Sequence, residues 1–397
     1  RIRILFALGI SISQWPVLSF SQIEVSTDFP GGSAEVLEID QEKQVLRLNP
    51  GDYPERGWRC WWYVKVSGLT PGKPFTLDVG EGVWATPDRA TFSIDDGKTW
   101  QHTAPGKREG KRIEYEVSLE KTSAQFAWGP PFVPSDAEAL VADMATALPE
   151  AKAFSLCQTR EGRNTPAIRI SGSESGSRPL IWIQARQHAW ESGSSWVAKG
   201  FGEWAASDQK EAVRFRELAD LVFVPIMDID NVHRGAGGKS QTPQDHNRDW
   251  TEAPHWNAVA AAQKFIRAAA EENRLAAFVD LHNPGSKDLF PYFYLPEPEL
   301  LSKPALKNQT VFLAAAKKRM TGPLRFTGRT IVSGSKYDPK AWKAISKNWV
   351  ATLGSDAVSV TLETTWNSPA STTEGYQTVG RQLGLALVDF LQKNQNP

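Results

Sequence analysis

The chain has 397 residues, of which 41% are hydrophobic and 23% charged, and 45 lysines and arginines balance 45 aspartates and glutamates. This is the composition of a globular protein long enough for two domains. The charge balance shows neither the basic surface expected of a nucleic-acid-binding protein nor an acidic tail. With only two cysteines, Cys60 and Cys157, a framework of several disulfides is excluded, and at most a single bridge could form.

Residues 1–21 have the pattern of an export signal. The cationic segment RIR is followed by the apolar run ILFALGISI, which is too short to span a bilayer. The small residues Ser19 and Ser21 precede a possible cleavage before Gln22. We therefore expect a signal peptide at 1–21, a secreted or periplasmic protein, and no stable membrane insertion after the signal is removed. An N-terminal strand and an uncleaved anchor remain as alternatives.

Residues 22–135 are predicted to form an all-β sandwich domain. Short runs alternate apolar and polar residues, at 60–66, 75–80, 90–96, 113–119 and 123–129. Turn sequences such as TPGK and DDGK separate them, and this spacing is typical of a sandwich. The proline-rich segment GPPFVPSD then marks a boundary.

Residues 136–397 are predicted to form an α/β catalytic domain. Near-continuous apolar runs at 180–185, 221–229, 275–281 and 357–362 have the character of strands covered on both faces. Helical periodicity is found at 136–148, 192–207, 255–273, 298–320 and 374–393, and Ser135 is the expected N-cap of the first of these helices. The alternation predicts a mixed, mostly parallel sheet with flanking helices.

Four polar residues follow three of these strands. His188 and Glu191 come after 180–185, His282 follows 275–281, and Glu363 follows 357–362. In open α/β sheets, ligands bind at the carboxyl edge of the strands. Two imidazoles and one carboxylate can hold a zinc ion and leave one coordination position open for water, with the second glutamate free to move protons.

With these segments in order, the chain resembles the zinc metallocarboxypeptidases of the M14 type, and within them the cytosolic-carboxypeptidase-like branch. The motifs are QARQHAWESGSSW, DIDNVHRG, DHNRDW, DLH and TLE. The segments RGWRCWWYVKV and SAQFAWGPPFVPSDAEAL are similar to the β-sandwich that precedes the peptidase domain in this branch. The resemblance covers nearly all of 22–397.

The resemblance implies a role for each matched residue. It makes His188, Glu191 and His282 the ligands of one zinc, Glu363 the general base and acid, Arg234 the group that polarises the scissile carbonyl, Asn247 and Arg248 the binders of the terminal carboxylate, and Asp245 the partner of His188. Tyr337 is the nearest match to the tyrosine that closes over substrate. In one departure from the branch, the segment HAWE places Trp190 where Pro-Gly is usual, which would reshape the pocket. His233, His246 and His255 are expected not to be ligands.

The implied activity is zinc-dependent hydrolysis of the C-terminal residue from peptides or proteins, with peptide C-termini as partners and no nucleic acid. One alternative is a zinc amidase or deacylase that acts on cell-wall peptides or N-acyl amino acids. The other is a catalytically inert binding protein. The pair Asn247 and Arg248 favours a free carboxylate beside the cleaved bond. Arg329 and Lys336, in the segment where the family often builds its specificity pocket, indicate acidic C-terminal residues.

Overall fold

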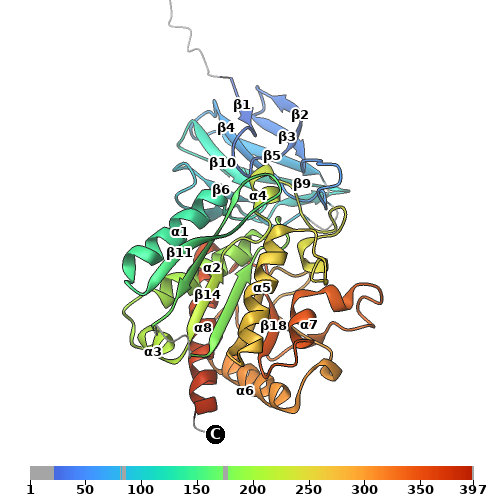
Figure 1. The fold of residues 1–397 in the computed structure, drawn as a ribbon. Helices are drawn as coiled ribbons and strands as arrows, with labels where there is room; N and C mark the ends of the chain where they lie inside the picture. Colours follow the sequence, from blue (N-terminus) through green and yellow to red (C-terminus); the bar gives the residue numbers. More distant parts are fainter. Residues whose placement is uncertain (1–21, 81, 83–85, 173–177, 396–397) are drawn as a thin grey trace, which may run out of the picture.

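The computed structural model describes residues 22–80, 82, 86–172 and 178–395, so the predicted signal peptide at 1–21 lies outside the described residues. A strand-rich N-terminal part sits on a larger part in which helices flank a sheet (Figure 1). Within the described ranges, no helix is both long enough and apolar enough to cross a membrane.

The N-terminal part consists of two five-stranded sheets. One has the order β1 (Glu24–Ser26), β4 (Tyr63–Ser67), β10 (Ser123–Ala127), β6 (Thr91–Ser93) and β7 (Gln101–His102). The other has the order β2 (Glu35–Asp40), β3 (Val45–Asn49), β5 (Pro74–Gly80), β9 (Arg112–Ser118) and β8 (Lys107–Glu109). Apolar side chains of both sheets, among them Trp62, Leu77 and Phe126, form one buried core, and the expected sandwich is confirmed.

The larger part is built on an eight-stranded sheet. Its order is β11 (Ala151–Gln158), β12 (Asn164–Ile170), β14 (Asp220–Val224), β13 (Leu180–Ala185), β15 (Leu275–His282), β18 (Val358–Glu363), β16 (Tyr292–Leu295) and β17 (Thr330–Val332). The four central strands β14, β13, β15 and β18 are parallel to one another, and antiparallel pairs flank them. The predicted mixed sheet is confirmed.

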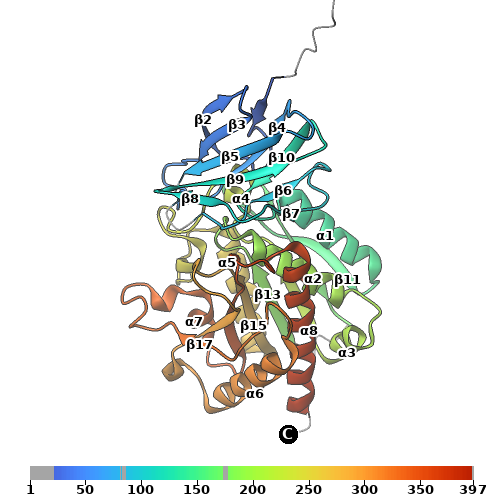
Figure 2. The same cartoon turned by 180° about the vertical axis from the view of Figure 1, so that it is seen from behind.

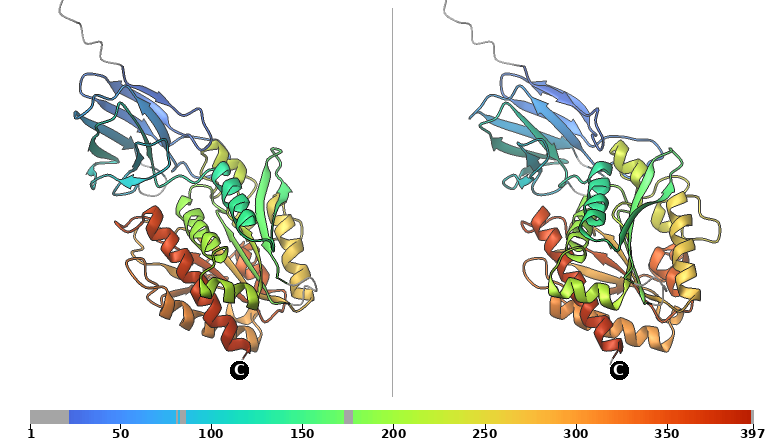
Figure 3. Two further views of the ribbon diagram at one scale, coloured as in Figure 1. Left: turned by 90° about the vertical axis from the view of Figure 1, so that its left-hand side faces the viewer. Right: turned by 60° about the vertical axis from the view of Figure 1, so that its left-hand side comes forward.

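Helices cover both faces of this sheet (Figures 2 and 3). One face packs against α1 (Pro134–Ala147), α2 (Ser192–Ala205), α3 (Lys210–Leu218), α6 (Lys303–Arg319) and α8 (Thr373–Gln395). The other packs against α5 (Asn257–Glu271) and α7 (Ser346–Ala351). The short helix α4 (Ile229–Arg234) follows β14. Because both faces are covered, the central strands are buried along their length, as their apolar sequences predicted.

Several element boundaries differ from the sequence expectation, and two of the differences are set by prolines. Helix α1 begins at Pro134, so Ser135 lies inside its first turn and is not the N-cap. Instead, the Asp136 carboxylate accepts the Val133 N–H at 2.7 Å, and proline suits the first helical position because its missing N–H costs no hydrogen bond there. Strand β14 ends at Val224, because Pro225 has no N–H to continue the ladder.

The two parts share a core beside the carboxyl edge of the parallel strands. Trp190, from the loop after β13, and Trp366, from the loop after β18, belong to the apolar cluster of the sandwich. The Trp128 ring lies 4.4 Å from Trp366 and 5.2 Å from Trp190, measured between ring centroids. The strand-rich part therefore packs directly against the loop that carries His188 and Glu191.

Cys60 and Cys157 are both free thiols.

Candidate active site

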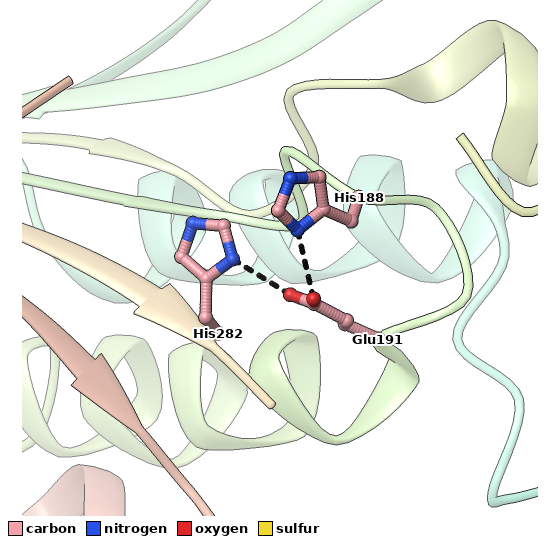
Figure 4. Close-up of side chains that lie close together, drawn as sticks. All are labelled: His188, Glu191 and His282. Carbon is pink, nitrogen blue, oxygen red and sulfur yellow. Dashed lines mark hydrogen bonds and ion pairs between the residues drawn. The ribbon is translucent and has the colours of Figure 1, made fainter. Parts of the chain in front are cut away.

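His188, Glu191 and His282 converge at the carboxyl ends of β13 and β15. The Glu191 carboxylate lies between the two imidazoles, with Oε1 2.8 Å from His188 Nδ1 and Oε2 2.7 Å from His282 Nδ1 (Figure 4). All three side chains are buried, and their possible ligand atoms lie within 4.8 Å of one another. The structure therefore brings together the three residues that the sequence grouped.

A carboxylate stands behind each imidazole. His282 Nε2 lies 3.0 Å from Asp280 Oδ2, and His188 Nε2 lies 3.4 Å from Asp245 Oδ1. Such a partner accepts the outer N–H of a metal-binding histidine and leaves the inner nitrogen as the donor to the metal. Asp245 was expected from the sequence, whereas Asp280 was missed. Its signal was the spacing DLH, since residues two apart on a strand point to the same face.

Asp280 is fixed by several donors. It accepts hydrogen bonds from Gln184, Gln187 and Ser346 as well as facing His282. These partners are buried. A buried carboxylate held by this many donors has a fixed position, so it gives the His282 ring a fixed orientation.

The electrostatics of the cluster favour a bound cation. Burial alone would raise the pKa of Glu191, but the two imidazoles lower it to about 2. Burial alone would lower the pKa of His282, but Asp280 and Glu191 raise it well above its ordinary value. Where the outer nitrogens donate to Asp280 and Asp245, the inner nitrogens and the Glu191 oxygens face each other as acceptors, and a cation between them would satisfy all of them. Two imidazoles and one carboxylate are a preferred donor set for zinc, and the residues present fit that ion.

The loop between the first two ligands is held by a buried arginine. Arg186 has a positive φ of 64°, and its guanidinium donates to the backbone carbonyls of Ala189 at 2.7 Å and Phe132 at 3.2 Å. Burial lowers the pKa of Arg186 to about 9. Because Ala189 lies between His188 and Glu191, these bonds fix the loop that presents both ligands.

Glu363 ends β18 directly beside His282, which ends the neighbouring strand β15. Its side chain is buried, and its Oε2 atom makes no hydrogen bond. Burial raises the pKa of Glu363 to about 8, with Glu191 acting in the same direction and His282 and Lys239 opposing it. A carboxylate with a raised pKa and an unused oxygen is suited to accept and return a proton near neutral pH.

These groups open onto one cavity of about 320 Å³. Its lining includes the three ligand residues and Glu363, the aromatic residues Trp58, Trp190, Tyr292, Tyr294 and Tyr337, the amide of Asn247, and the cations Lys239, Arg248, Arg329 and Lys347. Trp58 belongs to the strand-rich N-terminal part, so that part forms one wall of the cavity. Trp190, noted as a departure in the sequence, also lines it.

Asn247 and Arg248 lie in a short 3₁₀ turn (His246–Arg248) at the cavity. Asn247 Oδ1 accepts the Ser346 N–H at 3.0 Å, which fixes the amide. Arg248 donates through Nε to Asp338 at 2.9 Å and through Nη1 to the Asn247 carbonyl at 3.1 Å. These two bonds orient the planar guanidinium and leave its other N–H groups for a ligand.

Arg234 does not line the cavity, so the structure does not place it for the role expected of it. It ends helix α4, where its guanidinium donates to both oxygens of Glu161 at 3.1 Å, and its side chain is 41% exposed. The sequence expectation rested on the resemblance of the segment DIDNVHRG to a family motif, whereas the Arg234 side chain pairs with Glu161. The cation from this segment that lines the cavity is Lys239.

Tyr337 lines the cavity, although its side chain is 47% exposed, and its ring lies 5.3 Å from that of Tyr294. The remaining histidines expected to be non-ligands lie outside the three-residue cluster. His246, for example, stacks on Trp256 with ring centroids 4.9 Å apart, while its Nδ1 faces the Gln241 amide at 3.1 Å.

Lys347 is a cavity residue that the sequence did not reveal. It lies on α7, is 1% exposed, and contacts Ser333 and Asn348 through its ammonium. Burial lowers the pKa of Lys347 to about 7, with Arg248 acting in the same direction. Arg329 also lines the cavity, but it pairs with Asp288 and stacks on Tyr292. Lys336 does not line it.

Comparisons with known proteins agree with this site. Residues 137–264 match the family described as zinc carboxypeptidase. Human cytosolic carboxypeptidase 1 is 25% identical over 265 residues, which cover 55% of this chain and 22% of the relative. The zebrafish protein of the same name is 32% identical over 264 residues, covering 55% of this chain and 23% of the relative. This chain thus spans about a fifth of the length of these relatives.

Among solved structures, a metallo-carboxypeptidase from Burkholderia cenocepacia superposes with a TM-score of 0.81 at 20% identity, covering 94% of this chain and all of that chain. At this level of identity the likeness establishes the fold, including its strand-rich N-terminal part.

Proposed function

Because residues 137–264 match the zinc carboxypeptidase family, we propose that the protein is a metallocarboxypeptidase that removes the C-terminal residue from peptides or proteins. The observation that carries the proposal is the single cavity in which His188, Glu191 and His282 meet Glu363 and Arg248. It combines a metal-binding triad, a proton-transfer group and a carboxylate-binding cation.

His188, Glu191 and His282 would hold one zinc ion. When bound, zinc supplies a Lewis acid and lowers the pKa of water toward 7. Glu363 takes the proton of the attacking water on its unpaired Oε2 and later delivers it to the nitrogen of the leaving residue. The raised pKa of Glu363 suits the second transfer, because a carboxyl group that holds its proton near neutral pH can protonate an amine as the bond breaks.

Arg248 and Asn247 are proposed to bind the free carboxylate of the substrate. A guanidinium matches the planar carboxylate with two parallel hydrogen bonds, which a lysine cannot do. The bonds of Arg248 to Asp338 and to the Asn247 carbonyl fix its orientation before substrate arrives. We propose that Tyr337, which is exposed at the cavity, closes over the bound residue.

Lys347 and Arg329 support a preference for acidic C-terminal side chains. Both cations line the cavity. Lys347 is buried with only neutral partners in direct contact, and an entering carboxylate would stabilise its charged form. Of the two cations that the sequence suggested for an acidic preference, Arg329 lines the cavity and Lys336 does not. Lys347 takes the place of Lys336 in the proposal.

The same metal-binding residues can serve other amides, so a zinc amidase or deacylase is the second candidate. The cavity favours a carboxypeptidase over this alternative, because Arg248 and Asn247 line it and can bind a free carboxylate. An inert binding protein is disfavoured, because His188, Glu191, His282 and Glu363 line one cavity, as the proposed reaction requires.

Export through a signal peptide at 1–21, a secreted or periplasmic location and the domain division 22–135 and 136–397 remain proposals. The word cytosolic in the names of the matched relatives describes those proteins.

The proposal is tested by incubating the zinc-loaded protein with short peptides and following the masses of the products. We expect loss of single residues from the C-terminus, and no cleavage after zinc is removed by a chelator. Release of internal fragments, or of an N-acyl group alone, would point to the second candidate.

A further inference from the structure

We propose that Lys239 is the catalytic cation that stabilises negative charge on the carbonyl oxygen of the cleaved bond, and that the backbone at Arg56–Trp58, in the strand-rich N-terminal part, holds it there. The inference rests on the proposed peptidase function. It gives Lys239 the role that the sequence suggested for Arg234, polarisation of the scissile carbonyl, because Arg234 pairs with Glu161 and does not line the cavity.

The reaction needs such a cation. As the water oxygen bonds to the carbonyl carbon, the π electron pair of the carbonyl moves onto its oxygen. When that pair returns, the carbon–nitrogen bond breaks and the nitrogen takes the proton from Glu363. Positive groups aimed at the oxygen stabilise the charge that develops on it.

Four cations line the cavity among the residues that the structure describes, and the other three are already proposed to bind the terminal carboxylate or the side chain of the substrate. Arg248 pairs with Asp338, and Arg329 pairs with Asp288. The third, Lys347, is buried on α7 against Ser333. Lys239 alone among the four lies beside a ligand residue.

The ammonium of Lys239 lies against the outer edge of the His188 ring, and Lys239 lines the same cavity as Glu363. Its Nζ lies 3.4 Å from His188 Nε2 and 3.7 Å from Asp245 Oδ2. The first contact is a long hydrogen bond to the ring nitrogen, and the second is an ion pair beyond direct hydrogen-bond distance, so they use at most part of the three N–H donors of the ammonium. Its side chain is 17% exposed. The side chain is thus largely buried, and a charge in such a site acts more strongly than in bulk water. The ammonium retains N–H groups for a substrate oxygen.

The position of Lys239 is set by a close backbone contact between the two parts of the molecule. The Gly238 N–H donates to the Arg56 carbonyl, and the Trp58 N–H donates to the Lys239 carbonyl, each at 2.9 Å. Gly57, between these two residues of the N-terminal part, has a φ of +92°, and a Cβ there would lie 2.6 Å from the Lys239 carbonyl oxygen. Only glycine permits this approach. The Trp58 ring lies beneath the ammonium, 5.9 Å from Nζ.

A purely structural role for Lys239 would be to neutralise Asp245, the partner of His188. The two roles differ in what they affect. Neutralisation would act on zinc binding through His188, whereas stabilisation of the carbonyl oxygen acts on the reaction and on ligands that carry a negative tetrahedral oxygen.

The test compares wild type with Lys239→Met and Lys239→Arg. Zinc content, kcat and KM on a free-acid peptide, and the inhibition constant of a phosphinic peptide that mimics the tetrahedral state are measured. We expect Lys239→Met to keep one zinc, to lose about 10²-fold or more in kcat, as for removal of an oxyanion donor, and to bind the phosphinic peptide more weakly by a similar factor. Lys239→Arg should recover most of both losses.

Two outcomes overturn the assignment. If Lys239→Met cleaves peptides and binds the phosphinic peptide as wild type does, the residue is not the cation, while the peptidase function stands. If Lys239→Met and Lys239→Arg both lose zinc, the role is structural. A wild type that cleaves no peptide and does not bind the phosphinic peptide would instead reject the proposed function, and this inference with it.

The role of the N-terminal part is tested with a matched pair of glycine variants. Gly57 and Gly110 both have positive φ values in that part, but a Cβ at Gly110 would meet nothing within 4 Å. Gly57→Ala should therefore lower kcat and weaken binding of the phosphinic peptide with zinc retained, whereas Gly110→Ala should change neither. Equal behaviour of the two variants would contradict the claim that this contact positions Lys239.

Discussion

His282 and Glu363 lie directly opposite each other at the carboxyl ends of the neighbouring parallel strands β15 and β18. One residue is a candidate zinc ligand and the other the candidate proton carrier. Their proximity is therefore set by the register of two buried strands, and does not depend on a flexible loop. A sheet register is rigid because a slip of one strand by one residue would turn all of its side chains to the opposite face.

The ligand set predicts one zinc per chain. His188→Ala and His282→Ala should each abolish stoichiometric binding, because only two donors would remain. Metal analysis of the purified protein decides this. His233→Ala, on helix α4 outside the cluster, serves as the control and should retain the ion. A wild type without zinc at neutral pH would refute the mechanism.

Asp280→Asn should weaken zinc binding while leaving the three ligands in place. The variant replaces the acceptor of His282 Nε2 with a group that also carries donors, and partners of this kind typically contribute about 10–100-fold to metal affinity. Competition with a chelator measures the change in dissociation constant. Asp356→Asn, at a surface carboxylate that accepts from Ser302, should have no effect. Unchanged zinc affinity in Asp280→Asn would show that the orientation of His282 is set by other contacts.

Glu363→Gln should keep the fold and the zinc but lower kcat by at least about 10²-fold, the scale of general acid–base catalysis. The two side chains have nearly the same shape, so packing at the end of β18 should survive. The exposed Glu374→Gln is a control for loss of a carboxylate. Turnover close to wild type in Glu363→Gln would mean that another group carries the proton.

Much of this site follows from the sequence, because it depends on strands that are buried on both faces. Their apolar runs predicted the bounds of β13, β15 and β18 to within a residue or two. The candidate site residues His188, Glu191, His282 and Glu363 lie at or just after the ends of these strands. Once parallel strands are recognised, their carboxyl ends must meet at one edge.

The remainder depends on tertiary contacts that no local pattern encodes. The path of the loop after α4 decides that Lys239 lines the cavity and Arg234 does not, and that path is fixed by backbone bonds to Arg56 and Trp58. Lys347 has the sequence pattern of an ordinary surface lysine, and only the packing of α7 against the sheet buries it. The short strands of the sandwich were partly missed because their residues are largely polar and exposed.

Lys347→Met should reduce selectivity for acidic C-terminal residues. The buried ammonium is proposed to meet the substrate carboxylate, and charge-assisted hydrogen bonds contribute roughly 1.5–3 kcal/mol. We expect the ratio of kcat/KM for peptides ending in glutamate over those ending in leucine to fall by at least about tenfold. Lys336→Met, at a residue outside the cavity lining, should leave the ratio unchanged. A wild type that shows no acidic preference would remove Lys347 from the specificity pocket.

The central claim is that this protein reads the free carboxylate at a peptide end, and its most direct test is kcat/KM for one peptide as the free acid and as the C-terminal amide. Wild type should prefer the acid by at least about tenfold, the value of one charge-assisted contact. Arg248→Ala should lose activity on the acid by a similar factor and lose most of the discrimination. If wild type cleaves the amide as well as the acid, the carboxypeptidase account is contradicted, and the amidase or deacylase takes its place.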